Sequence, residues 1–252
     1  MKSILSSANG IREALKKHKN SVLLVSRKNR KAEELCSLAK QYGIKVKNVS
    51  DNEIIKLVGH QKFRGYALEI YEQAKSGTKK SIESLWLEYD AENTAVSPLV
   101  IVLDGITDTG NLGAVLRSAD QFEAAAVIIP KRRSAGTERD SLSRSSAGAA
   151  EWVSLIEVPN LPRALDELKE HGFWVWGADM DGESADKVNL KGPVVLVLGR
   201  EGEGLHRLVK EKCDGIIKIP SGGNIDSLNV SVAAGILMYE TRRQQKFIFS
   251  GK

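Results

Sequence analysis

Six short apolar runs, separated by stretches with helical spacing, constrain the fold of this chain more than any other feature. They occupy residues 99–103, 125–129, 152–156, 173–176, 194–198 and 215–219, as in LVIVL and VVLVL. Uninterrupted apolar runs are typical of strands that are buried on both faces, and helices between such strands form the parallel crossovers. We therefore predict an α/β domain over residues 98–252, with a mostly parallel sheet and helices on both of its faces.

The helices of this domain follow from apolar spacing. Leu112, Val115, Leu116 and Ala119 recur at i, i+3, i+4 and i+7, which predicts one helical stripe facing the sheet. Another helix is expected over 161–171, before Gly172. The last helix, expected over 229–245, is apolar almost throughout 230–239. We expect it to be buried on most sides, either threaded into the core or pressed against a second subunit.

The first 78 residues predict a separate, compact α/β unit. Helices are expected at 11–18, 30–42 and 52–58, and strands at 21–25, 44–49 and 66–70. The polar stretch KSGTKK at 75–80 has no apolar spacing, and residues 79–97 are interpreted as a linker with one short helix around 82–87. The predicted organisation is therefore a first domain over 1–78, a linker over 79–97 and a second domain over 98–252.

Composition excludes several classes of protein. Of the 252 residues, 42% are hydrophobic and 27% are charged, which is ordinary for a globular protein. No apolar run approaches the roughly 20 residues of a membrane span, and we expect a cytoplasmic protein without a membrane partner. The two cysteines, Cys36 and Cys213, are far apart and outside any CxxC pattern. A disulfide framework or a metal site is therefore not expected.

Charge is distributed unevenly along the chain. Residues 1–78 hold 16 basic and 7 acidic residues, whereas the other 174 residues hold 21 basic and 25 acidic ones. A basic unit joined to a slightly acidic one suggests that the first unit meets a polyanion. The alternative is a lysine-rich surface that only keeps the protein soluble.

Three glycine-rich loops follow predicted strands, where ligands bind in an open parallel sheet. They are DGITDTGNLGAVLR after residue 103, GREGEGL after residue 198 and PSGGNIDSLNVSVAAG after residue 219. The Walker pattern is absent, and Arg207 occupies the third glycine position of the dinucleotide fingerprint. Each loop alone is also consistent with a turn or a helix cap. Asn111 could cap one helix, Ser227 with Asn229 could cap another, and Glu201 could lie on the surface.

Taken together, the three loops resemble a known family. The stretches 111–117 (NLGAVLR), 198–205 (LGREGEGL) and 219–233 (IPSGGNIDSLNVSVA) are similar to the three signature motifs of the SpoU class of SPOUT RNA 2′-O-ribose methyltransferases. The resemblance covers residue 99 to the end. The basic first domain resembles the L30e-like RNA-binding domain of the family's 23S rRNA guanosine enzymes, with Phe63-Arg64-Gly65 leading into its last strand.

The resemblance implies a deep trefoil knot at the carboxy-terminal end of the domain, an S-adenosylmethionine (AdoMet) site within the knot, a homodimer and no metal. It implies the transfer of the AdoMet methyl group to the ribose 2′-hydroxyl of a guanosine in 23S rRNA. Three alternatives stay open: another rRNA nucleotide, tRNA, or a non-catalytic rRNA-binding assembly factor. A nucleotide-dependent oxidoreductase is disfavoured because the dinucleotide fingerprint is missing.

Residue roles follow from matching motif to motif. The expected catalytic residues are Asn111, Arg117, Glu201, Ser227 and Asn229. The expected cofactor-binding residues are Gly177, Leu198, Gly199, Glu201, Gly202, Ile219, Pro220, Ser227 and Leu228. Arg117 matches a residue that is regarded as the base in this family. Because a guanidinium group stays protonated, we hypothesise that Arg117 instead clamps a phosphate next to the reacting ribose.

RNA contacts are expected from clustered basic residues. In the first domain these are Arg12, Lys16, Arg27, Lys28, Arg30 and Lys31. In the second domain they are Lys131, Arg132 and Arg133, at the start of a segment over 134–150 that resembles the family's RNA-contacting loop. Such contacts to phosphates are salt-dependent, and a target nucleotide in a loop would have to be splayed out.

Overall fold

The computed structural model describes residues 2–58, 64–71, 82–83, 96–131, 139–223 and 227–249. The chain forms two compact units. The first unit comprises residues 1–77 together with 136–152, and the second comprises residues 78–135 together with 153–252. Each unit is described separately below.

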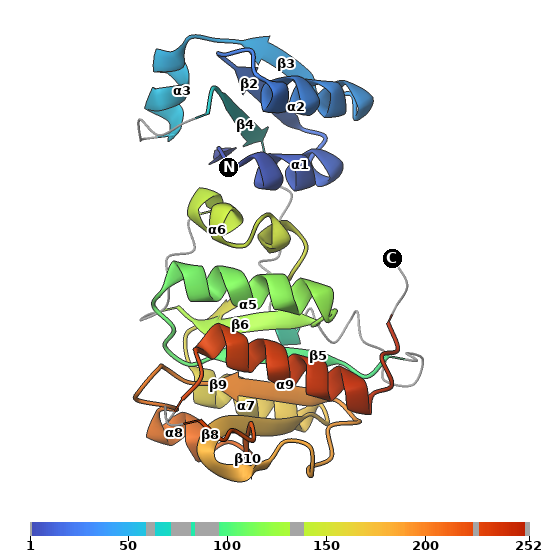
Figure 1. Cartoon of the computed structure of the whole chain (residues 1–252), viewed down its shortest axis with the longest axis vertical. Coiled ribbons are helices and arrows are strands. Elements are labelled where there is room, and N and C mark those ends of the chain that lie inside the picture. The colour runs from blue at the N-terminus through green and yellow to red at the C-terminus, as the bar shows by residue number, and fades with distance from the viewer. Residues whose placement is uncertain are drawn as a thin grey trace. The chain divides into compact units, whose positions relative to one another are not determined.

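The first unit contains a four-stranded sheet in the order β1-β4-β2-β3, with helices packed against it (Figure 1). Strand β4 pairs antiparallel with β1 and β2, and β2 pairs parallel with β3. The predicted elements between residues 11 and 70 are confirmed to within a few residues, whereas the short strand β1 was not predicted. The bounds are β1 Lys2–Leu5, α1 Ala8–Lys17, β2 Ser21–Val25, α2 Arg30–Gln41, β3 Lys45–Asn48, α3 Asp51–Val58 and β4 Tyr66–Tyr71.

Helix α6 (Arg139–Ser145) and the 3-10 turn η1 (Ala149–Glu151) also belong to the first unit. The sequence places them in the second domain, so the boundaries differ here. The reason is a set of contacts with α1. The indole Nε1 of Trp152 donates to Glu13 Oε2 at 2.9 Å, and Lys17 Nζ lies 4.3 Å from the centroid of that ring. His18 Nε2 lies 3.1 Å from Glu151 Oε2. Because Trp152 takes part in these contacts, the strand predicted over 152–156 begins only at residue 155.

The second unit contains a six-stranded sheet in the order β10-β8-β9-β5-β6-β7. All five strand pairs are parallel, which confirms the predicted parallel sheet. The bounds are β5 Leu99–Leu103, α5 Thr109–Gln121, β6 Ala126–Pro130, β7 Leu155–Val158, α7 Leu161–Glu170, β8 Trp174–Ser184, β9 Val194–Leu198, α8 Arg207–Lys210, β10 Gly215–Lys218 and α9 Val230–Gln244.

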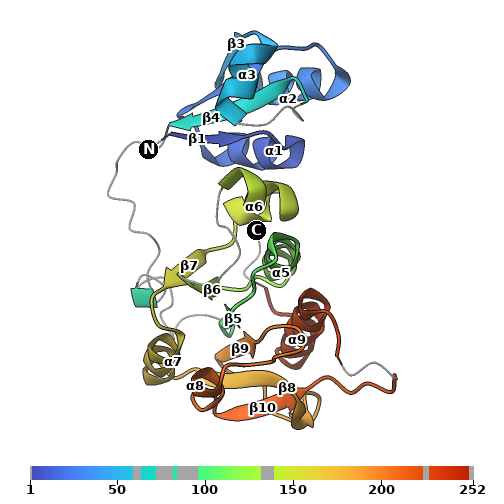
Figure 2. The same cartoon turned by 90° about the vertical axis from the view of Figure 1, so that its left-hand side faces the viewer.

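Helices cover both faces of this sheet, as predicted. Figure 2 shows α5 and α9 on one side of the strands and α7 and α8 on the other. Along β5 and β9, side chains alternate between the two faces. Val100, Val102, Val195 and Val197 face a core formed with α7 and α8. The alternate residues face α5 and α9, which pack against each other. Within the described part of the chain, no helix is long and apolar enough to cross a membrane.

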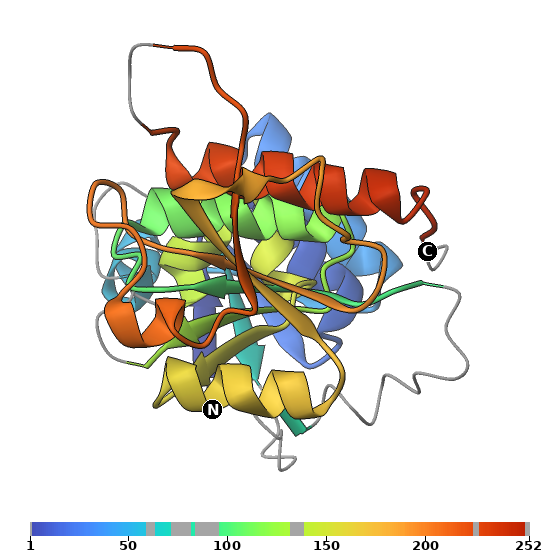
Figure 3. The ribbon, with the colours of Figure 1, turned by 90° about the horizontal axis from the view of Figure 1, so that it is seen from below.

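Within this chain α9 is buried on one side, and the expected burial of its other side against a second subunit stays a prediction. Figure 3 shows α9, in red, along one outer side of the sheet. Its Ala234, Leu237 and Met238 are fully buried, but Ile236 is 39% exposed and Tyr239 is 50% exposed. An almost continuous apolar sequence therefore covers the sheet with one side of the helix only. The other side is an apolar surface that stays partly exposed among the residues that the structure describes.

One buried cation anchors α9. Arg242 is fully buried, and its guanidinium group donates to the backbone carbonyls of Phe122 at 2.7 Å, Glu123 at 2.7 Å and Ser97 at 2.8 Å. Phe122 and Glu123 end α5, where the helix dipole is negative and carbonyl groups lack helical donors. Arg242 therefore ties the end of α9 to the end of α5 and to the residues that lead into β5.

We expect Arg242→Met to destabilise the second unit by about 3 kcal/mol or more, because charge-assisted hydrogen bonds to three buried carbonyls are lost together. Urea unfolding followed by circular dichroism measures the change. Arg243→Met is the matched control, since Arg243 is exposed and pairs with Glu240 at the surface. Similar midpoints for the two variants would contradict the anchoring role.

Candidate active site

The strand order reverses between β5 and β9, and this is where an open parallel sheet forms a ligand crevice. From β5 the chain builds outward through β6 to β7, whereas β9, β8 and β10 lie on the other side of β5. The carboxyl ends of the two strands are joined, because Asp104 N donates to Leu198 O at 2.8 Å. The loops that follow β5 and β9 therefore start side by side.

The loop after β5 leads into α5, and its helix cap is Asp108. The carboxylate Oδ1 of Asp108 accepts from the backbone N–H of Asn111 at 2.7 Å, which is an ordinary N-cap. The interpretation of Asn111 as a mere cap is therefore wrong. Its side-chain amide stays available at the first turn of the helix, while Leu112 and Leu116 hold the helix against the sheet.

The loop after β9 is a tight turn that depends on its glycines. Arg200 and Gly204 exchange two backbone hydrogen bonds of 3.0 and 2.9 Å. Gly202 and Gly204 have φ angles of 80° and 69°, a region that suits glycine. A Cβ on Gly199 would lie 2.2 Å from the backbone of Gly204, so only glycine fits there. The glycines of this motif therefore fix the backbone that carries Glu201.

Asn111, Glu201 and Asn229 meet in one hydrogen-bonded cluster. The amide Nδ2 of Asn229 donates to Glu201 Oε1 at 2.6 Å and to Asn111 Oδ1 at 3.0 Å. Asn111 Nδ2 donates to Glu201 Oε1 at 3.4 Å, and the backbone N–H of Val230 donates to the same oxygen at 3.3 Å. The three motifs, which are far apart in sequence, thus converge on one carboxylate.

Asn229 also caps α9. Its Oδ1 accepts from the backbone N–H groups of Ser231 at 3.0 Å and Val232 at 3.4 Å. The oxygen of the amide is used for the cap and the nitrogen for the cluster, so the cap and the site are not alternatives. A carboxylate at this position would cap the helix equally well but would face Glu201 with a like charge.

Arg117 and Ser227 are not part of this cluster. Arg117 is exposed on α5, and among the described residues it has no hydrogen-bond or ion-pair partner. It follows Asn111 by six residues, which at about 100° per residue places the two side chains on different sides of the helix. Ser227 is exposed just before Asn229. Both therefore reach toward solvent rather than toward Glu201.

The predicted cofactor residues lie around the carboxyl ends of the neighbouring strands. Leu198 ends β9, Ile219 and Pro220 follow β10, and Leu228 precedes the cap of α9 with 41% of its surface exposed. Gly177 lies inside β8, where a Cβ would approach Leu205 to 2.8 Å. Backbone N–H and C=O groups can form hydrogen bonds with the edge of a neutral adenine ring. The exposed leucine can pack against an apolar part of the ligand.

Sequence reasoning missed Asp104 and His206. Asp104 is 4% exposed. Its Oδ2 accepts from the backbone N–H of His206 at 2.8 Å, and its Oδ1 lies 2.9 Å from His206 Nδ1. Arg200 Nε adds a bond to Gly105 O at 3.0 Å. These contacts fasten the end of the turn 199–205 to β5. The sequence feature that could have indicated Asp104 is its position as an acidic residue directly after a predicted buried strand.

Two further groups near this edge have shifted pKa values. The hydrogen bond from Lys210 Nζ, 2.6 Å from Asp179 Oδ2, lowers the pKa of Asp179. This ion pair joins the end of α8 to β8. Burial raises the pKa of Cys213 to about 12, so its thiol is not a nucleophile near neutral pH. Cys36 and Cys213 are both free thiols in this chain.

The predicted RNA contacts in the first unit fall into two groups. Arg12, Lys16 and Arg27 each form an ion pair with a carboxylate. Lys28, Arg30 and Lys31 are exposed around the start of α2 and form no ion pair with any residue that the structure describes. Lys131 is exposed at the end of β6, and Arg132 and Arg133 lie outside the described residues.

We expect Asp104→Ala to loosen the turn 199–205, because the backbone N–H of His206 loses its buried acceptor. Amide hydrogen exchange of residues 199–206 should become about tenfold faster or more. His206→Ala is the matched variant: it keeps the backbone bond to Asp104 and should change exchange much less. Equal exchange in the two variants would show that the imidazole, and not the backbone, is held by Asp104.

Comparisons with known proteins bear on this geometry. The model of the SpoU rRNA Methylase family matches residues 98–239. The 23S rRNA (guanosine-2′-O-)-methyltransferase RlmB of Xanthomonas campestris is 38% identical over 96% of this chain and 92% of its own. An uncharacterized tRNA/rRNA methyltransferase of Borreliella burgdorferi is 36% identical over 88% of this chain and 97% of its own. The methyltransferase AviRb of Streptomyces viridochromogenes, solved with AdoMet, shares the fold with a TM-score of 0.73, at 21% identity over 98% of this chain and 91% of its own.

The family match covers all three loops of the cluster and the whole parallel sheet, and the relatives align along nearly the full chain. With the three motifs gathered at one edge of that sheet, the chain belongs to the SpoU rRNA methylase family.

Proposed function

We propose that this protein transfers the methyl group of AdoMet to the ribose 2′-hydroxyl of a guanosine in 23S rRNA. One observation carries the proposal: Glu201 joins Asn111 and Asn229 at the carboxyl ends of β5 and β9. A scaffold protein has no need of such a cluster. The Xanthomonas relative supports the choice of guanosine and of 23S rRNA.

The cofactor site is proposed at the carboxyl ends of β9 and β10, where the AdoMet of AviRb gives a precedent for the same fold. Leu198, Gly199 and Gly202 would hold it from one loop, and Ile219, Pro220 and Leu228 from the other, with Gly177 on β8 beside them. When bound, AdoMet supplies an electrophilic methyl group on a sulfonium ion. The protein then has to orient the ribose and remove its proton.

The catalytic residues divide this work. Asn111, Ser227 and Asn229 together hold the loop and the ribose in place. Glu201 fixes Asn111 and Asn229 by accepting their amide N–H groups. Arg117, exposed on α5, clamps the phosphate next to the reacting nucleotide, and its charge lowers the pKa of the 2′-hydroxyl. The alternative role of Arg117 as the base conflicts with a guanidinium group that stays protonated.

A homodimer is part of the proposal. The outer side of α9 exposes Val232, Ile236 and Tyr239. Beside them the tilted rings of Tyr239 and Phe247 lie 5.4 Å apart, and Phe247 itself is 40% exposed. An apolar helix face of this kind is typical of an interface between subunits.

The carboxy-terminal knot remains a proposal. Strand β10 pairs with β8 at the edge of the sheet, whereas α9, the next element, packs on β9 and α5 at its centre. The chain thus leaves the sheet at its border and returns to its centre, which supports the proposed knot.

The domain roles are also proposals, with 1–78 as an L30e-like RNA-binding domain, 79–97 as a linker and 98–252 as the methyltransferase. The free charges of Lys28, Arg30 and Lys31 support RNA binding by the first unit. With rRNA as its substrate, the enzyme would work in the cytoplasm.

The substrate alternative is tRNA or another rRNA nucleotide, and the name of the Borreliella relative leaves both open. The basic first unit, with its excess of nine positive charges over residues 1–78, favours a large folded RNA with many phosphate contacts.

To test the function, the purified protein is incubated with methyl-labelled AdoMet and protein-free large-subunit rRNA. We expect label at one guanosine whose 3′ bond resists alkaline cleavage. Asn229→Asp should abolish the transfer, because a second carboxylate faces Glu201, while the melting temperature stays near the parent value because Asp still caps α9. Arg117→Lys, which keeps the charge but loses the fork, should retain RNA binding and lose most of the activity if bidentate clamping is required.

Three results would change the proposal. Label in tRNA and not in rRNA would move the substrate to tRNA. AdoMet binding without transfer to free RNA would point to a ribosomal assembly intermediate as the substrate. Absence of AdoMet binding would favour the non-catalytic assembly factor.

We expect Ile236→Asp to convert the dimer into a monomer, because a charge is placed in the apolar face of α9. Light scattering coupled to size exclusion measures the mass. Leu208→Asp is the matched control: Leu208 is 55% exposed on α8, on the opposite face of the sheet. A monomeric parent protein, or a monomer from both variants, would contradict α9 as the interface.

A further inference from the structure

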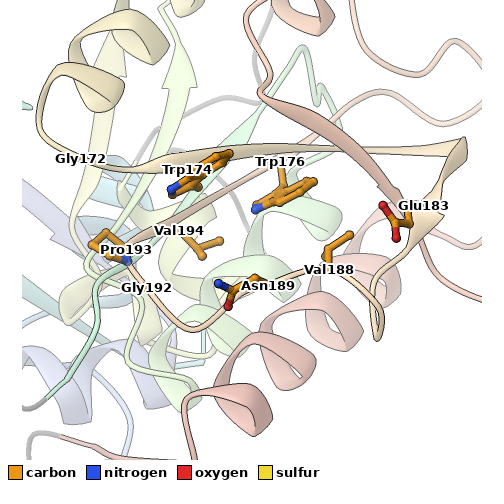
Figure 4. Close-up of a pocket in the computed structure, with 9 residues that line it drawn as sticks. All are labelled: Gly172, Trp174, Trp176, Glu183, Val188, Asn189, Gly192, Pro193 and Val194. Atoms are coloured by element: carbon orange, nitrogen blue, oxygen red, sulfur yellow. The ribbon is translucent and has the colours of Figure 1, made fainter.

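A concave site lies away from the cluster of Asn111, Glu201 and Asn229, beside the starts of β8 and β9. A cavity of about 500 Å³ opens between β8 and the segment 185–193 that leads into β9 (Figure 4). Trp174 and Val194, which begin β8 and β9, are part of its lining. None of its nine lining residues is among those assigned above to the cofactor or to catalysis.

Two tryptophans form the aromatic wall of this cavity. Trp174 and Trp176 are two residues apart on β8, so they share one face, while Val175 points into the core on the other. Their ring planes are within 21° of parallel and their centroids are 6.4 Å apart. Trp174 is 59% exposed. A large apolar ring at such exposure is unusual for a side chain that only fills a core.

Trp176 is held in place by the neighbouring strand. Gly215 of β10 pairs with it, and a Cβ at that position would lie 2.3 Å from the indole ring. The glycine therefore lets the ring lie against β10. The Nε1–H of Trp176 is buried and donates to no acceptor in the described part of the chain. An unsatisfied buried donor costs free energy that a ligand with an acceptor can recover.

A carboxylate reaches the same face through an irregularity in β8. Gly177 pairs with Ile216, but the next pair joins Glu183 to Ile217, so residues 178–182 loop out of the register. Glu183 thus takes the position next to Gly177, on the face of Trp176. Figure 4 shows the Glu183 carboxylate at the end of the cavity away from Trp174, and Asn189 below the rings.

The wall opposite the tryptophans is fixed by α9. Gln244 Nε2 donates to Ala185 O at 3.2 Å, and its Oε1 accepts from Leu190 N at 2.9 Å. Gln245 Nε2 donates to Leu190 O at 3.2 Å and to Gly192 O at 3.0 Å. Leu190 itself is fully buried. The cavity is therefore largely formed before any ligand binds, which reduces the ordering that binding requires.

We propose that this cavity binds an unpaired guanine base of the RNA. Near-parallel indoles offer stacking surfaces, which single-stranded RNA uses widely. A carboxylate accepts hydrogen bonds only. Guanine presents two adjacent N–H donors on its pairing edge, whereas adenine presents an acceptor next to its amino group. Glu183 therefore favours guanine, and Asn189 can donate to its carbonyl oxygen. The assignment of this base to RNA rests on the proposed function.

The test measures binding to the full chain without methyl transfer. The probes are GMP, AMP and two fluorescein-labelled single-stranded pentaribonucleotides that differ in one central guanine or adenine. S-adenosylhomocysteine is present at saturation, so that the cofactor site is filled. Indole fluorescence reports GMP and AMP, and anisotropy reports the oligonucleotides. We expect both guanine probes to bind more tightly than the adenine probes.

Trp174→Ala should weaken binding of the guanine oligonucleotide by about 5- to 150-fold. Trp152→Ala is the matched control, an exposed tryptophan of the first unit, and should leave GMP binding unchanged. Glu183→Gln, a surface change that preserves folding, should bring the affinities for guanine and adenine together. In steady-state methylation, Trp174→Ala should raise KM for RNA with little change in kcat.

The proposal is overturned if neither guanine probe binds, if Trp174→Ala binds them like the parent, or if adenine and guanine bind equally to the parent. Binding of GMP without binding of the guanine oligonucleotide would assign the cavity to a free nucleotide. It would overturn the proposal that the base belongs to RNA. A protein that binds the probes but transfers no methyl group would contradict the proposed function and leave the cavity assigned.

Discussion

The pairing of β5 with β9 is the constraint on which the second unit depends. It places the two central strands of the sheet side by side, from Leu99 opposite Val194 to Leu103 opposite Leu198. Because both strands run in the same direction, their following loops leave the sheet at one edge. The bond from Asp104 N to Leu198 O continues the ladder into those loops. A site assembled from distant motifs is a direct consequence of this register.

The third motif reaches the carboxyl ends of these strands by a different route. Strand β10 lies at the border of the sheet, and α9 has to begin beside Glu201. The two nitrogen-bound protons of the Asn229 amide serve Glu201 and Asn111, while its oxygen serves the first turn of α9. The start of the helix and the site are therefore set by one side chain. At the far end, Arg242 fixes the same helix to the end of α5. Between these two anchors α9 has little freedom, which suits a helix that carries both a site residue and an exposed apolar face.

Much of this architecture could be predicted from the sequence, because strands buried on both faces leave uninterrupted apolar runs. The run 194–198 matches β9 in full, and the run 99–103 matches β5. Short edge elements leave weaker signals: β1 has only four residues, two polar and then two apolar. The apolar stretch 230–239 indicated a helix but not its surroundings. Apolar character shows that a face is kept from water, and a partner subunit and a core leave the same pattern. Likewise 139–152 carries no signal of the unit it joins, since its contacts with α1 depend on single pairs such as Trp152 and Glu13.

The candidate site was partly visible because its polar residues stand in glycine-rich loops after strands. What the sequence could not reveal are features that depend on register. Asp104 looks like any loop residue until β9 brings His206 beside it. Glu183 stands seven residues from Trp176, too far along a regular strand to share a cavity. Only the outward loop of 178–182, seen in the pairing with β10, brings the two together. The same irregularity follows Gly177, at the cofactor edge. One break in the ladder therefore lies beside both a predicted cofactor residue, Gly177, and the carboxylate that reaches the cavity, Glu183.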